Sequence, residues 1–305
     1  MSDRVLRVGT RGSALALAQS GMVADRIARI AGCSVELVRI RTEGDVNTGP
    51  LATIGGTGVF VTAVREALLD GRVDVVVHSY KDLPTAPAGG ISLTAVPARE
   101  NPFDALCARN RLTLGELPAG STVGTGSPRR TAQLLTRRPD LQVVPIRGNV
   151  DTRLRRVTDG DLDAVVLAAA GLNRLGRSDA ITQILDTDVM LPAPAQGALA
   201  VETRADDGDW YTDAVRALDD PATRAAVLAE RVLLRDLEAG CSAPVGALGQ
   251  VADDALTLRA VVVALGGGDE FRVLRGGPVS SAAELGAAAA AELLSQGAAH
   301  LLGPR

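Results

Sequence analysis

Aromatic residues are scarce in this sequence of 305 residues, in which Phe, Trp and Tyr together make up 2%. Proteins that bind single-stranded nucleic acid usually stack the bases on aromatic side chains. The chain also has a net charge of −4, and it has no lysine-rich tail because it contains a single lysine. We therefore expect no nucleic-acid partner.

Cysteines and long hydrophobic runs are scarce as well. The cysteines Cys33, Cys107 and Cys241 are odd in number and form no CxxC pair, which argues against a disulfide framework and a zinc site. No run approaches the ~18 apolar residues of a membrane helix. The stretch MSDRVLRVGTRGS lacks the apolar core of a signal peptide. We expect a cytoplasmic protein with no membrane partner and no bound metal.

Short apolar runs alternate with helical periodicities along the chain, a pattern that is typical of α/β folds. A length of 305 residues allows two or three domains, and 46% hydrophobic residues can supply their cores. The first main predicted helix follows Ser13, which is expected to be its N-cap. The second ends near residue 69, the third begins at Pro128, and the last two cover residues 223–237 and 282–296. Strands are predicted over residues 4–9, 34–41, 71–77, 91–96, 104–108, 122–125, 141–146, 162–167, 256–264 and 270–275.

Two phrases recur in the same order. Val8-Gly9-Thr10 returns as Val123-Gly124-Thr125, and the pattern GxxDxVV that begins at Gly71 returns at Gly160. Together they suggest two similar α/β domains that face one another across a cleft, with crossovers at residues 97–102 and 191–202. We expect a first domain over residues 1–97 with 198–216, a second over residues 103–192, and a small α+β domain over residues 220–305.

The stretch VVVHSYKDLPT, residues 75–85, is the centre of the predicted site. Three valines form a buried strand, and polar residues follow where ligands bind in open α/β sheets, beyond the carboxyl end of the strand. Lys81 and Asp82 are therefore candidates for chemistry. Lys81 is the only lysine beside 31 arginines, which hints that a guanidinium group does not serve at this position.

Arginine is concentrated in residues 121–180, which contain ten arginines and six acids, a charge of +4 within an acidic protein. Such a block indicates a site for anionic ligands, because arginine binds carboxylates and phosphates through two parallel hydrogen bonds. Solvated helix faces account for Arg137, Arg138 and Arg156. The loop Thr10-Arg11-Gly12-Ser13, which precedes the first predicted helix, is a second possible anion site.

Seven motifs, in order along most of the chain, resemble the porphobilinogen deaminase family, also called hydroxymethylbilane synthase. The first four are GTRGSALALAQ, HSYKDLPT, GTGSPRR and PIRGNVDTRLRR. They are followed by AAGLNRLG, PAQGALAVE and LEAGCSAPVGA. The resemblance implies two α/β domains of the periplasmic-binding-protein type flanking a cleft, together with a small α+β C-terminal domain.

The resemblance also implies an activity. Members of the family deaminate porphobilinogen and join four molecules head to tail onto a covalently bound dipyrromethane primer. They release hydroxymethylbilane and ammonia, which makes the protein a transferase of tetrapyrrole and heme biosynthesis. By the same resemblance, the dipyrromethane would be joined to Cys241 through a thioether, and the protein would be a monomer.

The matched motif positions imply roles for individual residues. Asp82 and Lys81 would be catalytic, with Asp82 stabilising positive charge on the pyrroles and moving protons. The cofactor would be bound by Cys241, Ser127, Arg129, Arg130, Lys81, Asp82 and Arg147. Porphobilinogen would be bound by Arg11, Ser13, Arg153, Arg174, Phe60 and Gln196. The glycine-rich stretch before Phe60 departs from the family, because Thr57 stands where a lysine is common.

Two other hypotheses remain open at this point. A non-catalytic solute-binding module would share the two-domain cleft and would leave Cys241 unmodified. An enzyme that forms a Schiff base on Lys81, or that uses pyridoxal phosphate there, would make the lysine itself the reactive group.

Overall fold

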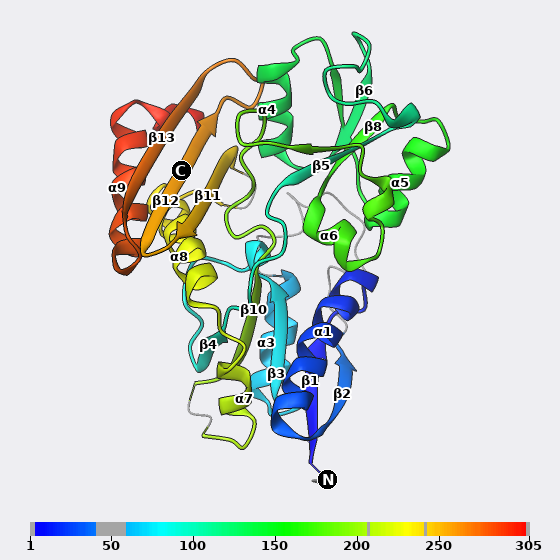
Figure 1. Cartoon of the computed structure of the whole chain (residues 1–305). Helices are drawn as coiled ribbons and strands as arrows, with labels where there is room; N and C mark the ends of the chain where they lie inside the picture. Colours follow the sequence, from blue (N-terminus) through cyan, green and yellow to red (C-terminus); the bar gives the residue numbers. More distant parts are fainter. Residues whose placement is uncertain (1–3, 41–58, 206–207, 241–242, 303–305) are drawn as a thin grey trace. The chain divides into compact units, whose positions relative to one another are not determined.

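The computed structural model describes residues 4–40, 59–205, 208–240 and 243–302, and only the backbone of residues 59 and 60 (Figure 1). By compactness the chain divides into two units. Unit 1 comprises Met1–Arg99 and Ala198–Arg224, and unit 2 comprises Glu100–Gly197 and Ala225–Arg305. No described helix is both long and apolar enough to cross a lipid bilayer. The expected three-domain bounds remain a prediction.

Unit 1 is built on a five-stranded sheet in the order β2-β1-β3-β10-β4, in which β1, β2 and β3 run parallel and β10 runs antiparallel to β3 and β4. Helices pack on both faces of this sheet. The strands are β1 (Val5–Thr10), β2 (Ser34–Arg39), β3 (Val75–Ser79), β4 (Ile91–Ala95) and β10 (Leu199–Arg204). The helices are α1 (Ala14–Ala31), α3 (Val59–Leu69) and α7 (Thr212–Arg216).

The valines of β3 show why this strand is apolar without interruption. Successive side chains of a strand point to opposite faces. Val75 and Val77 accordingly pack in the core that contains residues of α1 and α7, whereas Val76 packs in the core that contains residues of α3. β3 is therefore a central strand covered on both sides, as predicted from its sequence.

Unit 2 contains a second five-stranded sheet, in the order β7-β6-β8-β5-β9, and one end of β8 leads directly into a helix. β6, β7 and β8 run parallel, and β5 runs antiparallel to β8 and β9. The strands are β5 (Asp104–Ala108), β6 (Thr122–Thr125), β7 (Gln142–Pro145), β8 (Ala164–Ala168) and β9 (Gln183–Leu185). The helices are α4 (Pro128–Arg137), α5 (Val150–Thr158) and α6 (Ala169–Arg174).

The two five-stranded sheets have equivalent strand arrangements, and the repeated phrases occupy equivalent places in them. The connectivity differs in one strand, because the equivalent antiparallel strand comes last along the chain in unit 1 (β10) and first in unit 2 (β5). In unit 1 the Asp74 carboxylate accepts a hydrogen bond of 2.8 Å from the backbone N–H of Arg7 within β1. In unit 2 the Asp163 carboxylate accepts a hydrogen bond of 2.8 Å from the backbone N–H of Thr122 at the start of β6. The repeat predicted from the sequence is therefore a repeat of structure, down to single hydrogen bonds.

Unit 2 also contains a three-stranded antiparallel sheet, β11-β12-β13, which shares a core with α8 and α9. Its tight loop before β13 contacts α4, because a Cβ at Gly267 would lie 2.8 Å from the backbone of Leu135, and the N–H of Gly268 donates to Thr136 Oγ1. The elements are α8 (Pro221–Asp236), β11 (Val245–Ala252), β12 (Ala255–Val263), β13 (Glu270–Pro278) and α9 (Ala282–Ser295).

The structure differs from the predicted elements in several places, among them β9 and α7, which were not predicted. β3 begins at Val75 and not at residue 71, because Gly71 adopts a φ of +69° in the turn before the strand. β10 lies in a segment that was interpreted as a crossover. β11 was not predicted, and it contains Gly246 and Gly249, which are poor strand formers. These two glycines admit Leu191 and the backbone of Ala226 against the strand.

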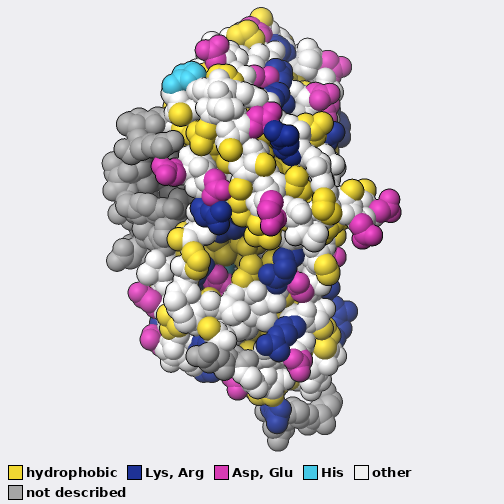
Figure 2. Space-filling model, turned by 90° about the vertical axis from the view of Figure 1, so that its left-hand side faces the viewer, with side chains coloured by type: hydrophobic (Ala, Val, Ile, Leu, Met, Phe, Trp, Pro, Cys, Tyr) yellow, Lys and Arg dark blue, Asp and Glu magenta, His cyan; other side chains and the backbone are white. Residues whose placement is uncertain are grey.

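The surface arginines of unit 2 are paired as expected of solvated helix faces. Arg137 pairs with Glu270, and Arg138 pairs with Asp140. Basic and acidic side chains are likewise interspersed over the face drawn in Figure 2. Exposed pairs of this kind contribute little to stability.

Candidate functional site

The segment after β3 holds the first group of predicted residues. Tyr80–Asp82 forms a single 3₁₀ turn, in which the N–H of Tyr80 donates to the carbonyl of Ala198 at 3.0 Å. Tyr80 and Leu83 are buried, whereas Asp82 is exposed and Lys81 is half-buried. The turn therefore anchors the chain through its apolar residues and leaves the carboxylate of Asp82 at the carboxyl end of β3, as predicted.

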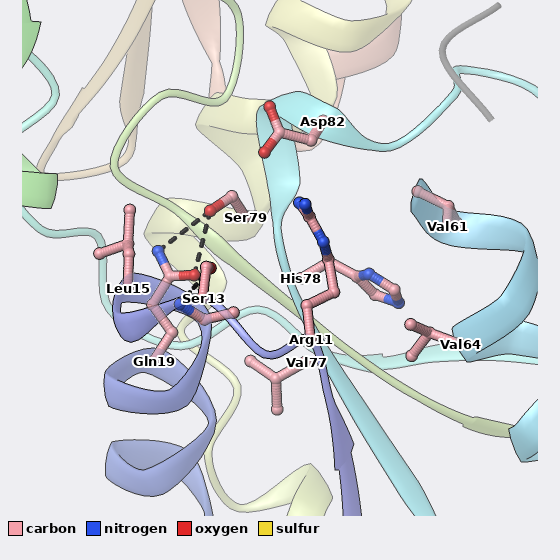
Figure 3. A pocket seen from close by; sticks show the side chains of 11 residues that line it. Arg11, Ser13, Leu15, Gln19, Val61, Val64, Val77, His78, Ser79 and Asp82 are labelled. Atoms are coloured by element: carbon pink, nitrogen blue, oxygen red, sulfur yellow. Dashed lines mark hydrogen bonds between the residues drawn. The ribbon is translucent and has the colours of Figure 1, made fainter. Parts of the chain in front are cut away.

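A pocket in unit 1 opens beside this turn (Figure 3). Asp82 lies at one end of the pocket, and the side chain of Arg11 extends toward that end from the loop after β1 (Figure 3). The structure thus brings together three predicted residues, Arg11, Ser13 and Asp82. The lining residues are Arg11, Ser13, Leu15, Ala16, Gln19, Val61, Val64, Val77, His78, Ser79 and Asp82.

One wall of the pocket is fixed by the first turns of α1. Ser13 is the N-cap of this helix, and its Oγ accepts a hydrogen bond of 3.3 Å from the N–H of Ala16, as the sequence predicted. Two turns later, the amide of Gln19 lies 3.0 and 3.1 Å from Ser79 Oγ, which ties α1 to the end of β3. The N-terminus of α1 is thus directed at the pocket, where its partial positive charge favours anions.

The other wall is supported by a buried group of charges around Glu202 of β10. Arg65 of α3 donates to its carboxylate at 2.9 and 2.5 Å, and His78 Nε2 lies 3.3 Å from Oε2. Burial would raise the pKa of Glu202, but the interactions with the nearby His78 and with Arg65 outweigh it and lower this pKa to about 2. The His78 ring that lines the pocket is therefore backed by a carboxylate that is ionised at neutral pH.

In unit 2 a second group of predicted residues surrounds Asp104, the first residue of β5. Arg129 and Arg130, at the start of α4, are only 4% and 6% exposed. Arg129 Nη1 lies 2.8 Å from Asp104 Oδ2, and Arg130 Nη2 lies 2.7 Å from Oδ1. Burial opposes ionisation of Asp104, but the charges of the two arginines prevail and keep its pKa well below the ordinary value.

Two more predicted residues of unit 2, Gln196 and Arg174, form hydrogen bonds with other residues of the same unit. Gln196 is fully buried and donates from Nε2 to Asp104 Oδ1 at 2.9 Å and to the carbonyl of Pro102 at 2.8 Å. Arg174 Nη2 donates to the carbonyl of Gly197 at 2.6 Å, and burial lowers the pKa of this arginine. The residues predicted to bind substrate thus also hold segment 195–197 in place.

The remaining predicted residues of unit 2 lie at strand and helix ends. Ser127 is the N-cap of α4, with its Oγ 3.5 Å from the N–H of Arg130, and Arg147 is exposed after β7. Arg153 is half-buried, and both burial and the charge of Arg130 lower its pKa, which shows that these two arginines are near one another. Cys241 and Thr57 lie outside the described residues, and so does the side chain of Phe60.

Asp104, Gln19 and Glu202 were not among the predicted site residues. The only indication of Asp104 in the sequence is a single acid at the start of an apolar strand.

The duplicated fold also shows how the two halves differ, because Lys81 and Asp82 after β3 correspond to Ala170 and Gly171 after β8. Only unit 1 therefore carries charged groups at this turn.

Comparison with known proteins agrees with these motifs. Residues 6–212 match the family described as "Porphobilinogen deaminase, dipyromethane cofactor binding domain", and residues 224–295 match "Porphobilinogen deaminase, C-terminal domain". The chain is 54% identical to porphobilinogen deaminase 1 of Streptomyces coelicolor, covering 100% of this chain and 99% of the relative. It is 54% identical to porphobilinogen deaminase of Mycobacterium tuberculosis, covering 98% of both.

Among solved structures, the methionine-binding protein MetQ superposes with a TM-score of 0.45 at 14% sequence identity. The match covers 70% of this chain and 89% of that chain. The effector-binding domain of a BenM variant superposes with a TM-score of 0.40 at 13% identity, covering 70% and 91%.

Proposed function

The chain belongs to the porphobilinogen deaminase family, and we propose that it joins four porphobilinogen molecules head to tail, as a monomeric transferase, onto a dipyrromethane held by Cys241. Four amino groups leave as ammonia, and one water releases the product as hydroxymethylbilane. The observation that carries the proposal is the exposed carboxylate of Asp82 at the end of β3, in one pocket with Arg11 and the N-terminus of α1.

The described residues fit a dipyrromethane, whose acetate and propionate groups are anionic. Around Asp104 two buried guanidinium groups face one carboxylate, and Arg153 adds a third positive charge nearby. Arg129 Nε is buried without a hydrogen-bond partner among the described residues, which leaves a donor for an anion. When bound, the dipyrromethane supplies the pyrrole carbon to which the first porphobilinogen is joined.

Asp82 supplies the electrostatics that the reaction needs. Porphobilinogen becomes electron-poor as its amino group leaves, and positive charge develops on its pyrrole nitrogen. A fixed carboxylate beside that nitrogen stabilises the charge, and the same carboxylate can take up the proton that is lost when the ring regains aromaticity. Lys81, the adjoining residue, adds a compact positive charge that can pair with a substrate carboxylate or assist the departure of ammonia.

The anionic side chains of the substrate require cationic partners on the protein. In unit 1, Arg11 and Ser13 supply a guanidinium group and a helix N-terminus at the pocket. We assign cofactor binding to Ser127, Arg129, Arg130 and Arg147 together with Lys81 and Asp82. We assign substrate binding to Arg11, Ser13, Phe60, Arg153, Arg174 and Gln196.

The carboxylate of Asp82 can be tested by Asp82→Asn, which keeps the side-chain volume but removes the charge. We expect the rate of porphobilinogen consumption to fall by about 100-fold or more, as is typical when a preorganised electrostatic partner is removed. Asp70→Asn is the matched control, because Asp70 is exposed and pairs only with the exposed Arg72. Full activity of Asp82→Asn would refute the role given to Asp82.

The covalent group can be tested by the intact mass of the purified protein. We expect an excess of the size of a dipyrromethane that peptide analysis maps to Cys241 and that Cys241→Ser abolishes. A solute-binding module would show reversible binding and an unmodified cysteine. A Schiff-base enzyme would instead show a borohydride-trapped adduct on Lys81.

A further inference from the structure

Asp104 occupies a position at which the fold does not require an acid. It is the first residue of β5, where it pairs with Ala168 at the end of β8. The equivalent residue of the sheet in unit 1 is Leu199, the first residue of β10, which pairs with Ser79 at the end of β3. An apolar side chain thus serves at the same topological position, so the carboxylate of Asp104 has another purpose.

The contacts of Asp104 are all directed at residues that carry the proposed binding function. Its Oδ1 accepts from Arg130 Nε at 2.9 Å and from Gln196 Nε2 at 2.9 Å, and its Oδ2 lies 2.8 Å from Arg129 Nη1. The residue is 0% exposed. Oδ1 of this completely buried carboxylate therefore accepts hydrogen bonds from one guanidinium group and one amide. Oδ2 has no hydrogen-bond partner among the described residues and faces the second guanidinium group as an ion pair.

Each guanidinium group is also held from a second side. Arg129 Nη1 donates to the carbonyl of Leu191 at 2.6 Å, and Arg130 Nη1 donates to the carbonyl of Val166 at 2.9 Å. An arginine side chain loses rotamer entropy when it is fixed. Here that entropy is lost on folding, before any ligand arrives, which favours binding of the ligand.

The charges of this cluster do not cancel. One carboxylate faces two guanidinium groups, which leaves a net charge of +1 in a buried place, and burial lowers the pKa of Arg129 because its charge is only partly compensated. A second anion would complete the neutralisation. A carboxylate group of the ligand has this charge, and Arg129 Nε is a donor for it.

We propose that Asp104 is a positioning residue, whose carboxylate fixes the guanidinium groups of Arg129 and Arg130 in the geometry that receives the carboxylates of the dipyrromethane. The inference rests on the proposed function, because it presupposes that these two arginines bind the cofactor. Asp104 itself does not contact the ligand, since its side chain is completely buried in the protein. It acts through the arginines alone.

The test compares Asp104→Asn, which removes the charge, with Asp104→Glu, which keeps the charge but displaces it by one methylene. Each chain is produced without a porphobilinogen supply and is then exposed to porphobilinogen, from which the two-pyrrole cofactor can be built. Intact mass gives the rate at which the dipyrromethane-sized excess appears and its dependence on porphobilinogen concentration. The thermal unfolding midpoint is measured on the same samples.

We expect the porphobilinogen concentration for half-maximal loading to rise at least 10-fold in both variants. For Asp104→Glu we expect this rise although its thermal unfolding midpoint stays near that of the wild type. Asp140→Asn is the matched control, because Asp140 pairs with Arg138 at the surface of the same unit. This control should load like the wild type. A purely structural carboxylate would instead let every folded variant load normally.

Three results would overturn the inference. Normal loading of Asp104→Glu would show that charge without position suffices. Tighter loading of Asp104→Asn would show that Asp104 competes with the ligand for the arginines. Failure of both variants to fold would make Asp104 a requirement of the fold itself. A wild type that acquires no mass on Cys241 would instead refute the proposed function.

Discussion

Glu202 and Asp104 are buried carboxylates, and each is stabilised by arginine from a neighbouring helix. Arg65 of α3 donates to Glu202 through two nitrogens, and Arg130 of α4 does the same to Asp104. Burying a carboxylate is costly unless charged partners and hydrogen bonds compensate it. Removal of one partner is therefore expected to cost more than the loss of a surface ion pair.

The pKa of Glu202 leads to a prediction of pH-dependent stability. Because this pKa is lowered from 4.5 to about 2 on folding, the ionised carboxylate stabilises the protein above pH 4.5 and this contribution is lost as the pH falls toward 2. We expect Glu202→Gln to lower the free energy of unfolding at pH 7 by roughly 3 kcal/mol. The deficit should shrink by about 1 kcal/mol between pH 7 and pH 3.5.

Urea unfolding of the wild type and Glu202→Gln at several pH values measures this difference. Glu66→Gln is the control, because Glu66 is exposed on α3, the helix that also carries Arg65. A deficit of Glu202→Gln that does not change with pH would contradict the depressed pKa.

At the scale of single elements, strand starts are held by aspartates that precede the neighbouring strand. The carboxylate of Asp163 accepts from the N–H and the hydroxyl of Thr122 at 2.8 and 2.9 Å, and it also pairs with Arg109. The N–H of Thr122 at the start of β6 therefore depends on a side chain for its hydrogen bond. Asp74 does the same for Arg7 in unit 1.

We expect Asp163→Ala to destabilise the protein by roughly 1–3 kcal/mol, since it leaves a backbone N–H without its partner. The measurement is chemical denaturation followed by circular dichroism. Asp161→Ala is the matched control two residues away, because Asp161 pairs with Arg156 at the exposed surface and should cost less than about 1 kcal/mol. Equal effects of the two substitutions would show that the hydrogen bond to Thr122 is dispensable.

Elements with a strong local pattern were predictable from the sequence. The strands at residues 104–108 and 122–125 and the N-cap at Ser13 agree with the structure. β10 and β11 were not predicted, because prolines and glycines near or within them indicate turns locally, while the pairing that makes them strands comes from distant residues. β10 pairs with β3, more than a hundred residues away in sequence.

The site was predictable to the same degree. Asp82 was a candidate because the strand before it ends in polar residues, and the structure places Arg11 and Ser13 in the pocket that Asp82 also lines. The buried partners of Arg129 and Arg130 could not be predicted, because the contact with Asp104 joins residues 25 and 26 positions apart through the fold of unit 2. Their binding roles remain predictions.

At the scale of the whole molecule, the chain passes between the two units next to Glu100 and Gly197. These residues bond to one another, because the N–H of Glu100 donates to the carbonyl of Gly197 at 3.2 Å. Arg174 donates to the same carbonyl, and Asn173 Nδ2 donates to the Glu100 carboxylate at 3.0 Å. Two of the three connections between the units, those at residues 99–100 and 197–198, therefore leave unit 2 from a single point that α6 holds.

Gly197 cannot be replaced at this point without strain. Its φ is +88°, and a Cβ would lie 2.3 Å from the carbonyl oxygen of Glu100. We expect Gly197→Ala to lower the free energy of unfolding by roughly 1–3 kcal/mol or more. Gly115→Ala is the control, because a Cβ there meets nothing within 4 Å and Gly115 does not have a positive φ. Equal stability of the two variants in urea would contradict this account.

The correspondence of the turns after β3 and β8 provides an internal reference for experiments on this enzyme. A change made in one half can be repeated at the matching position of the other, as with Asp74 and Asp163. Any difference between the two outcomes then reports the surroundings and not the substitution. The turn with Ala170 and Gly171 has no charged side chain at these two positions, so it is a reference for the effects of the ammonium group of Lys81 and the carboxylate of Asp82.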